Sequence, residues 1–411
     1  MTEADSRDEL SWDLLRDMTS RSANAERRET LGWMIDVLEG WLGPEWPNRV
    51  TRSESNLRSM VVGMTGYVAA LATWLELALR VQRFEGASGM VKLRKMANDL
   101  TLGRFLHVRA ALEIGALAEG ICTAIAFEPE LGPAVVGPGD VRLTFVDRAP
   151  LDIEVRVLLA SERWRVVYDW GEQLRDVTMA QSYEHRVRFT IDASSIQDAV
   201  QYEDLVRAIE DIAVAANASR SNTRTVLESG ATVAAELVDE PTPFHDISYP
   251  PYFEEDGLRR LRGALRDKAE KYVDCRPVWI RLDVLDGLLA LSPWAQDPVG
   301  VQLAAISAAI RDVLSGSPGA AGVVMSSAAT SHDSGPDDDN ATVEGVEHSV
   351  AVSRRLPLLR RRNTFIVPLH EKAVADVALW RSMYEKEPQW LPDMLQAAGL
   401  PTVDQINPRS N

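Results

Sequence analysis

Four charged residues in the second quarter of the chain have the types and spacing that metal-assisted hydrolysis requires. Glu113 lies in a helical pattern and Asp140 follows a proline-glycine turn. Glu154 and Arg156 alternate with apolar residues, so both side chains should point to one face of a strand. Carboxylate oxygens suit magnesium or manganese, and a nearby cation stabilises the charge that develops on a phosphate under attack by water. We therefore predict a phosphodiester-cleaving site in which Asp140 and Glu154 are the metal ligands.

The residues around this set indicate the elements that position it. Residues 105–124 have helical spacing, and a second helix is expected at 258–272. Four segments alternate or are apolar in the manner of strands, and we expect them in one mixed sheet: 141–146, 151–159, 278–283 and 322–326. The predicted fold is α/β (α+β), a mixed sheet flanked by helices, with the first helix on one face and the second close by.

The order helix-Glu, strand-Asp, turn, strand-Glu-x-cation resembles the PD-(D/E)xK nuclease superfamily, which has a restriction-endonuclease-like fold. The matching stretches are AALEIGALAEG, GPGDVRLTF and PLDIEVRVLL, with a looser likeness through LRRLRGALRDKAEKY and PVWIRLD. The resemblance implies a magnesium- or manganese-dependent nuclease in DNA metabolism or bacterial defence. It makes Glu113 the helix carboxylate, Asp140 and Glu154 the metal ligands, and Arg156 the occupant of the catalytic lysine position.

Two departures from that pattern leave the function open. Gly139 stands where the proline next to the aspartate is expected, and Arg156 keeps the charge of the lysine but does not readily release a proton. Lys268 or Lys271, from another element, are alternative sources of the missing lysine. The chain is therefore interpreted either as a divergent enzyme or as a non-catalytic protein-interaction module that retains a nuclease-like fold.

The charge of the chain restricts how it would bind nucleic acid. The net charge of −17 disfavours a general polyanion binder, so phosphate contact requires a locally basic groove. The helix at 258–272 carries candidate contact residues: Arg259, Arg262, Arg266 and Lys268. The alternative is a solvated helix face, just as Asp152, Glu154 and Arg156 would be the solvated face of an edge strand.

Histidines and cysteines offer no recognisable metal motif. The six histidines are scattered, and His107, six residues before Glu113, is interpreted as a structural or surface residue. The two cysteines form neither zinc spacing nor a disulfide framework, and the polar N-terminus lacks an apolar signal core. These features predict a cytoplasmic protein.

The apolar segment 59–79 is long enough to be compared with a membrane span. Its glycines and Glu76, and the arginine that follows it, favour a buried core helix instead, so no membrane is expected. Because one helix face cannot bury so many apolar residues, we expect an exposed strip that contacts a partner protein or a second copy.

The organisation along the chain follows from these patterns. We expect a polar leader, an N-terminal helical layer, a nuclease-like core with an insertion at about 160–250, an acidic flexible loop, and C-terminal strands and helices. The corresponding residues are 1–26, 27–100, 101–330, 331–342 and 343–411.

Overall fold

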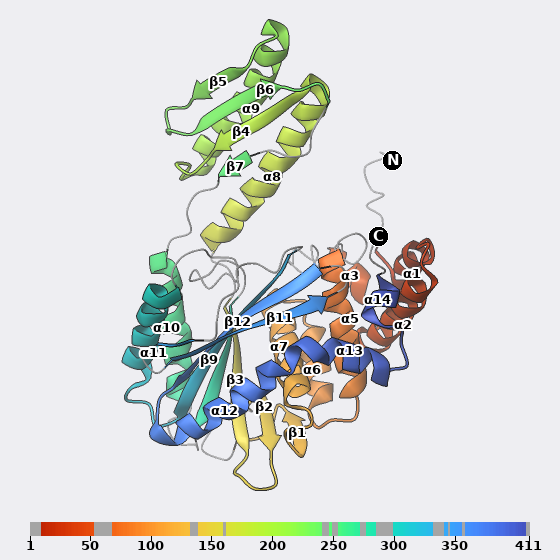
Figure 1. Ribbon diagram of the computed structural model, residues 1–411, viewed down its shortest axis with the longest axis vertical. Helices are drawn as coiled ribbons and strands as arrows, with labels where there is room; N and C mark the ends of the chain where they lie inside the picture. The colour runs from red at the N-terminus through yellow and green to blue at the C-terminus, as the bar shows by residue number, and fades with distance from the viewer. Residues whose placement is uncertain are drawn as a thin grey trace. The chain divides into compact units, whose positions relative to one another are not determined.

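The computed structural model describes most of the chain and divides it into two compact units. The larger unit comprises residues 1–159 and 257–411, and the smaller unit comprises residues 160–256, which corresponds to the expected insertion (Figure 1). The described residues are 10–52, 68–131, 139–158, 162–240, 246–248, 254–271, 277–284, 299–331, 341–343, 346–355 and 358–407.

The described strands of the larger unit form one eight-stranded mixed sheet. In spatial order they are β1 (Ala124–Phe127), β2 (Val141–Thr144), β3 (Leu151–Leu158), β8 (Val278–Val284), β9 (Ala320–Ser331), β12 (Leu358–Pro368), β11 (Val346–Arg355) and β10 (Ala341–Val343). β3, β8 and β9 run parallel, while the remaining pairs are antiparallel. The predicted sharing of one sheet by β2, β3, β8 and β9 is confirmed, and the fold is α/β.

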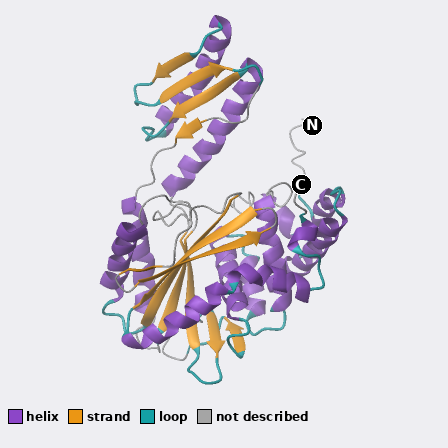
Figure 2. Ribbon diagram, in the orientation of Figure 1, coloured by secondary structure: helices purple, strands orange, loops and turns teal. Residues whose placement is uncertain are grey.

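Helices cover both faces of this sheet, as Figures 1 and 2 show. Ile153 and Val155 pack in the core formed with α7 (Leu102–Ala118) and α12 (Glu371–Glu385). Side chains on the other face of the sheet, such as Ile280, pack with α10 (Glu254–Lys271) and α11 (Val299–Leu314). The predicted positions of the helices at 105–124 and 258–272 are confirmed, except that α7 ends at Ala118 and the chain then turns into β1.

The N-terminal helices share the core of α7 and the sheet rather than forming a separate subdomain. They are α1 (Trp12–Ser20), α2 (Ala25–Leu42), α3 (Trp46–Arg52), α5 (Val68–Arg83) and α6 (Met90–Ala97), and α13 (Glu387–Ala397) and α14 (Val403–Ile406) join them. The expectation of a loose polar leader is wrong for α1, because Trp12 and Leu15 anchor this otherwise polar helix in the core.

The expected exposed apolar strip is not found on the described part of segment 59–79. From Ala72 onward, α5 is buried on nearly all sides because it packs against α2, α7 and α13. Residues 59–67 lie outside the described part of the chain. Among the described helices, none combines the length and the apolar character needed to cross a bilayer.

The smaller unit has its own sheet and its own core. Its described elements are α8 (Glu162–His185), β4 (Val187–Asp192), α9 (Ala199–Ser219), β5 (Thr223–Val226), β6 (Thr232–Leu237) and β7 (Asp246–Ser248). The strand order is β5-β6-β4-β7, and alternate residues of β4, such as Phe189, pack on α8 and α9. Residues 160–256 contain 19 acidic and 8 basic side chains, a net charge of −11 within the −17 of the chain.

Candidate metal centre

Asp140 is fixed at the start of β2 by the backbone of β3. Its backbone N donates to Ile153 O at 3.3 Å, and its Oδ2 accepts a hydrogen bond from Val155 N at 2.6 Å. The residue is 7 % exposed. Because one carboxylate oxygen is held by the backbone, the other is kept in a defined position and is available to a ligand.

The local structure favours glycine, and not proline, at position 139. Its backbone N–H donates to Pro129 O at 2.8 Å, a bond that a proline would remove. A Cβ at this position would also lie 2.9 Å from Leu131 Cδ2. Glycine at position 139 therefore allows this residue to lie close to Leu131.

Two side chains that the sequence motif did not include lie beside Asp140. His107 Nε2, from α7, is 3.3 Å from Asp140 Oδ1 and 4.0 Å from Glu128 Oε1. The potential ligand atoms of these three residues all lie within 4.8 Å of one another. Among the described residues, this is the one group of His, Cys, Asp and Glu side chains that meets that condition, so one ion can be reached by all three.

Strand register brings Glu128 opposite Asp140. β1 and β2 pair with Phe127 opposite Val141, so the next residues outward face each other, and Glu128 N donates to Asp140 O at 2.9 Å. Glu128 has a φ of +49°, a left-handed conformation that a residue with a side chain adopts at a cost of order 1–3 kcal/mol. The surrounding structure therefore holds Glu128 beside Asp140 against its intrinsic preference.

The electrostatics of the group reflect an excess of carboxylates. Burial raises the pKa of Glu128, and the charge of Asp140 raises it further. Burial acts to lower the pKa of His107, but Asp140, Glu128 and Glu154 outweigh it and the pKa is raised. Burial acts to raise the pKa of Asp140, but His107, the Val155 N–H and Lys268 outweigh it and the pKa is lowered. Such a site favours a bound cation.

Glu154 lies next to this group and is paired with two lysines of α10. Glu154 is 1 % exposed, its Oε1 pairs with Lys268 Nζ, and its Oε2 is 3.4 Å from Lys271 Nζ. Leu261 and Leu265 of α10 are buried in the core. Lys268 follows Leu265 by about one helical turn, so its side chain leaves the helix on the same side, at the edge of this core. The positive charge of Lys268 also acts to lower the pKa of Asp140.

The other basic candidates are more accessible to solvent than these carboxylates. Arg156 shares a strand face with Glu154 and is exposed, while Lys268 and Lys271 of α10 contact Glu154. On α10, Arg259 and Arg266 are exposed and Arg262 is half-buried. These residues line the accessible side of the helix that carries Lys268.

Glu113 belongs to a different set of charges in the core. Its carboxylate is 3.0 Å from Arg281, 2.9 Å from Arg362 and 3.7 Å from Arg80, and all three arginines are buried. Six residues rotate a helix by about 240°, so Glu113 and His107 leave α7 in different directions. The resemblance made Glu113 the helix carboxylate of the site, whereas the structure places His107 of the same helix beside Asp140.

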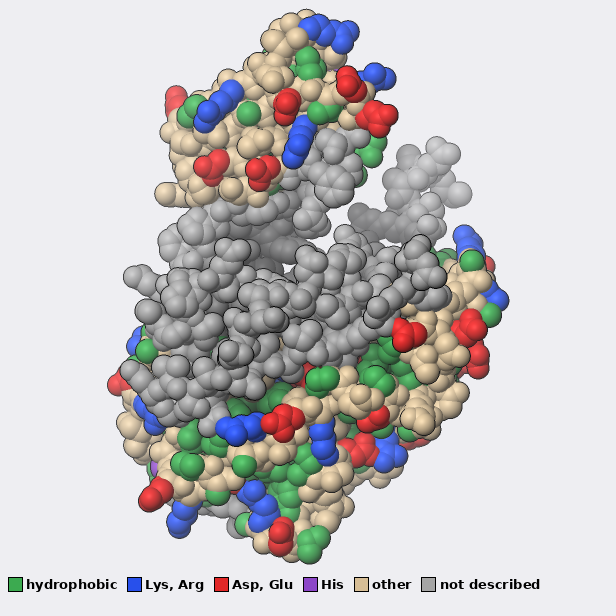
Figure 3. Space-filling model, viewed as in Figure 1, with side chains coloured by type: hydrophobic (Ala, Val, Ile, Leu, Met, Phe, Trp, Pro, Cys, Tyr) green, Lys and Arg blue, Asp and Glu red, His purple; other side chains and the backbone are tan. Residues whose placement is uncertain are grey.

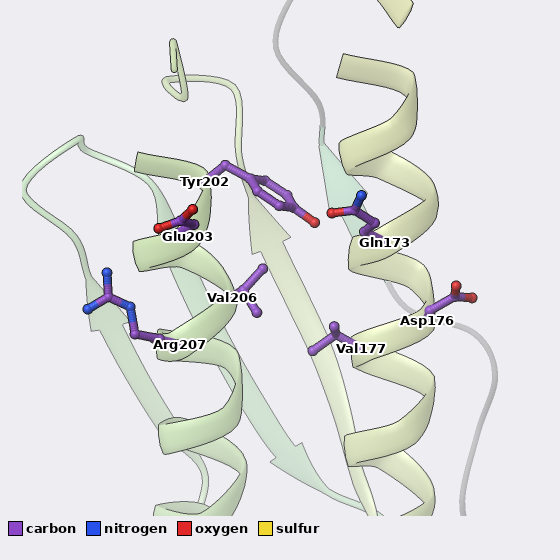
Figure 4. A pocket seen from close by; sticks show the side chains of 7 residues that line it. All are labelled: Gln173, Asp176, Val177, Tyr202, Glu203, Val206 and Arg207. Carbon is purple, nitrogen blue, oxygen red and sulfur yellow. The ribbon is translucent and has the colours of Figure 1, made fainter. Parts of the chain in front are cut away.

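A pocket of about 500 Å³ lies between α8 and α9 of the smaller unit (Figure 4). Val177 and Val206 face each other across it, and the ring of Tyr202 stacks on Trp170 at 5.1 Å. Burial raises the pKa of Tyr202 to about 12, so its phenol stays protonated at neutral pH. The described residues that line the pocket are Gln173, Asp176, Val177, Tyr202, Glu203, Val206 and Arg207. None of these seven is a histidine or a cysteine.

No protein-family model matches the chain, and comparisons with curated proteins and with solved structures also give no match.

Proposed function

We propose that the protein is a divergent metal-dependent nuclease-like enzyme that cleaves phosphodiester bonds of nucleic acids, with magnesium or manganese as cofactor. The observation that carries the proposal is the pairing of Lys268 of α10 with Glu154 of β3, next to Val155, whose N–H donates to Asp140. The elements α7, β2, β3, α10 and β8 also follow one another in the order that the PD-(D/E)xK resemblance implies.

In this proposal Asp140, with its neighbours His107 and Glu128, would hold the metal, and Glu154 would lie beside it. A bound divalent ion neutralises charge on the scissile phosphate and lowers the pKa of a coordinated water. Lys268 supplies what Arg156 does not, namely an amine that can both stabilise charge and release a proton. Lys268, once it has released its own proton to solvent, would accept a proton from the attacking water, while Lys271 keeps a positive charge beside Glu154.

Contact with the nucleic acid is assigned to α10. Arg259 and Arg266 are exposed on the helix that carries Lys268, and Arg262 lies between them. Elsewhere on the face drawn in Figure 3, described Lys and Arg side chains are interspersed with Asp and Glu. Because the chain is acidic, we expect a short phosphate footprint. The salt dependence of binding should therefore be shallow, because its slope is proportional to the number of phosphates contacted.

A non-catalytic interaction module is the second candidate. Its support is the pairing of Glu154 with both lysines, which leaves less of that carboxylate for a metal. The acidic smaller unit also suits a basic protein better than a nucleic acid. The described N-terminal helices give no support to a contact through an exposed apolar strip.

The test is cleavage of single- and double-stranded DNA and RNA with Mg²⁺ or Mn²⁺ at matched ionic strength. We expect activity on at least one substrate and a loss of about 100-fold or more in Asp140→Asn and in Lys268→Gln. Asp147→Asn, in the exposed turn between β2 and β3, is the matched control and should keep full activity.

Each variant is first shown to be folded by circular dichroism. Absence of cleavage by the folded wild type on all four substrates with both metals would remove the enzyme proposal in favour of the interaction module.

A further inference from the structure

We propose that the centre formed by His107, Glu128 and Asp140 selects Mn²⁺ over Mg²⁺, with His107 Nε2 as a nitrogen ligand. The catalytic meaning of this selectivity rests on the proposed function, whereas the metal-binding claim concerns the three side chains alone. The sequence predicted Asp140 and Glu154 as the metal ligands. The inference replaces this pair by two carboxylates and one imidazole nitrogen.

The distances in the group suit a shared ion. Ligand atoms about 2.1 Å from an octahedral ion lie about 3 Å apart when adjacent and about 4.2 Å apart when opposite. The separations of His107 Nε2 from Asp140 Oδ1 and Glu128 Oε1 are 3.3 and 4.0 Å, between those limits. Small side-chain adjustments would therefore bring the three atoms into one coordination shell.

Two of the ligand atoms are buried and, within the described residues, lack hydrogen-bond partners. These are His107 Nε2 and Glu128 Oε1, and the Glu128 side chain is only 8 % exposed. The contact of Nε2 with Asp140 is close but not aligned as a hydrogen bond. Buried polar atoms are nearly always satisfied in native proteins, so an ion that bonds to both atoms accounts for their arrangement. The strained backbone of Glu128 adds to this, because it holds the carboxylate toward His107.

The ligand types determine the selectivity. Mg²⁺ strongly prefers oxygen ligands in near-ideal octahedral geometry and gives up its waters reluctantly. Imidazole suits first-row transition ions, and carboxylates suit manganese, so one histidine with two carboxylates favours Mn²⁺ over Mg²⁺. Glu154 is not part of the group of three and keeps its lysine partners, so the metal and the cation of the site lie side by side.

The experiment uses the full chain after metal removal with a chelator. Mn²⁺ binding is followed by electron paramagnetic resonance, Mg²⁺ is added in competition, and pulsed spectra report a nitrogen nucleus coupled to bound Mn²⁺. The variants are His107→Gln and Glu128→Gln. The matched control is His185→Gln in the smaller unit, and thermal melts establish that every variant is folded.

We expect one Mn²⁺ site with a preference over Mg²⁺ of about 100-fold and with nitrogen coupling. His107→Gln should abolish the coupling and weaken Mn²⁺ binding about tenfold or more, while Mg²⁺ binding changes about threefold or less. Glu128→Gln should weaken the binding of both ions but keep the coupling, and His185→Gln should match the wild type.

Equal affinities for the two ions, no Mn²⁺ binding by the folded protein, or nitrogen coupling that persists in His107→Gln would each overturn the inference. Nitrogen-coupled Mn²⁺ without any cleavage would leave the inference standing and remove the proposed nuclease function. Magnesium-supported cleavage without nitrogen coupling would overturn the inference and support the proposed nuclease function.

Discussion

Lys268 of α10 pairs with the buried carboxylate of Glu154 in β3, although 114 positions separate the two residues along the chain. The basic partner of this carboxylate therefore comes from the helix that follows the smaller unit and not from the strand itself. Arg156, two positions after Glu154 on the same strand, is exposed.

The pair should contribute measurably to stability. Loss of one partner leaves a buried carboxylate less neutralised, which can cost 3–5 kcal/mol, but Lys271 remains on Glu154 in a single variant. We expect Lys268→Met to lower the free energy of unfolding by about 1–2 kcal/mol, and Lys268→Met/Lys271→Met to exceed the sum of the single variants. Urea denaturation measures both effects, and strictly additive losses would show that the two lysines do not share Glu154.

Arg156 and Lys268 should differ sharply in an activity assay. Arg156→Lys is expected to change cleavage by about twofold or less, because Arg156 is exposed. Lys268→Arg should reduce cleavage by about 100-fold if proton release from this side chain matters. A large gain of activity in Arg156→Lys would instead assign the catalytic cation to β3, as the motif implies.

Glu113 is expected to act in stability and not in metal binding. It neutralises the buried Arg281 and Arg362, so Glu113→Gln should lower the free energy of unfolding by about 3–5 kcal/mol. The control Glu119→Gln, at the half-exposed end of α7, should cost about 1 kcal/mol or less. Calorimetric titration of the folded Glu113→Gln protein should give wild-type Mn²⁺ affinity, and a lost site would make Glu113 a ligand.

His107 should make the stability of the metal-free protein depend on pH. Its pKa is raised above the ordinary value of 6.5, so its contribution is fully present below that pH and is lost as the pH rises through the folded-state pKa. We expect wild type to exceed His107→Gln in unfolding free energy by more at pH 6 than at pH 9, measured by urea denaturation with a chelator. A difference that is constant or larger at pH 9 would contradict the assigned direction.

The alternation of charged and apolar residues was enough to predict β2 and β3. It determines which face of each strand packs against the core. The site could not be placed in the same way. Glu128 faces Asp140 because Phe127 pairs with Val141, and the residue pattern does not specify that register. α7 is buried on almost all sides, so its periodicity does not show that His107, and not Glu113, turns toward Asp140.

The partners of charged residues in the folded chain could not be predicted from the sequence either. Asp152, interpreted as solvated, is buried and pairs with the partly exposed Arg142. Arg362, which lies in a basic run of the sequence, is buried and pairs with Glu113. The burial of a charged residue depends on the elements that pack against it. From the sequence alone, such a residue is assigned to the surface. The basic spacing of α10 did suggest Lys268 as an alternative amine, although its distance from Glu154 was beyond sequence reasoning.

The insertion of the smaller unit between β3 and α10 has a consequence for folding kinetics. The equilibrium cost of a longer connection is small, about 0.6 kcal/mol for each doubling of its length. The rate is more sensitive, because Ile153 must find Trp279 before the parallel β3–β8 pair can form. We expect the smaller unit, which has its own core, to fold early and β3 to join β8 late. Glu154 and Lys268 lie at the two ends of this connection, so their pairing should appear only in the slowest folding phase.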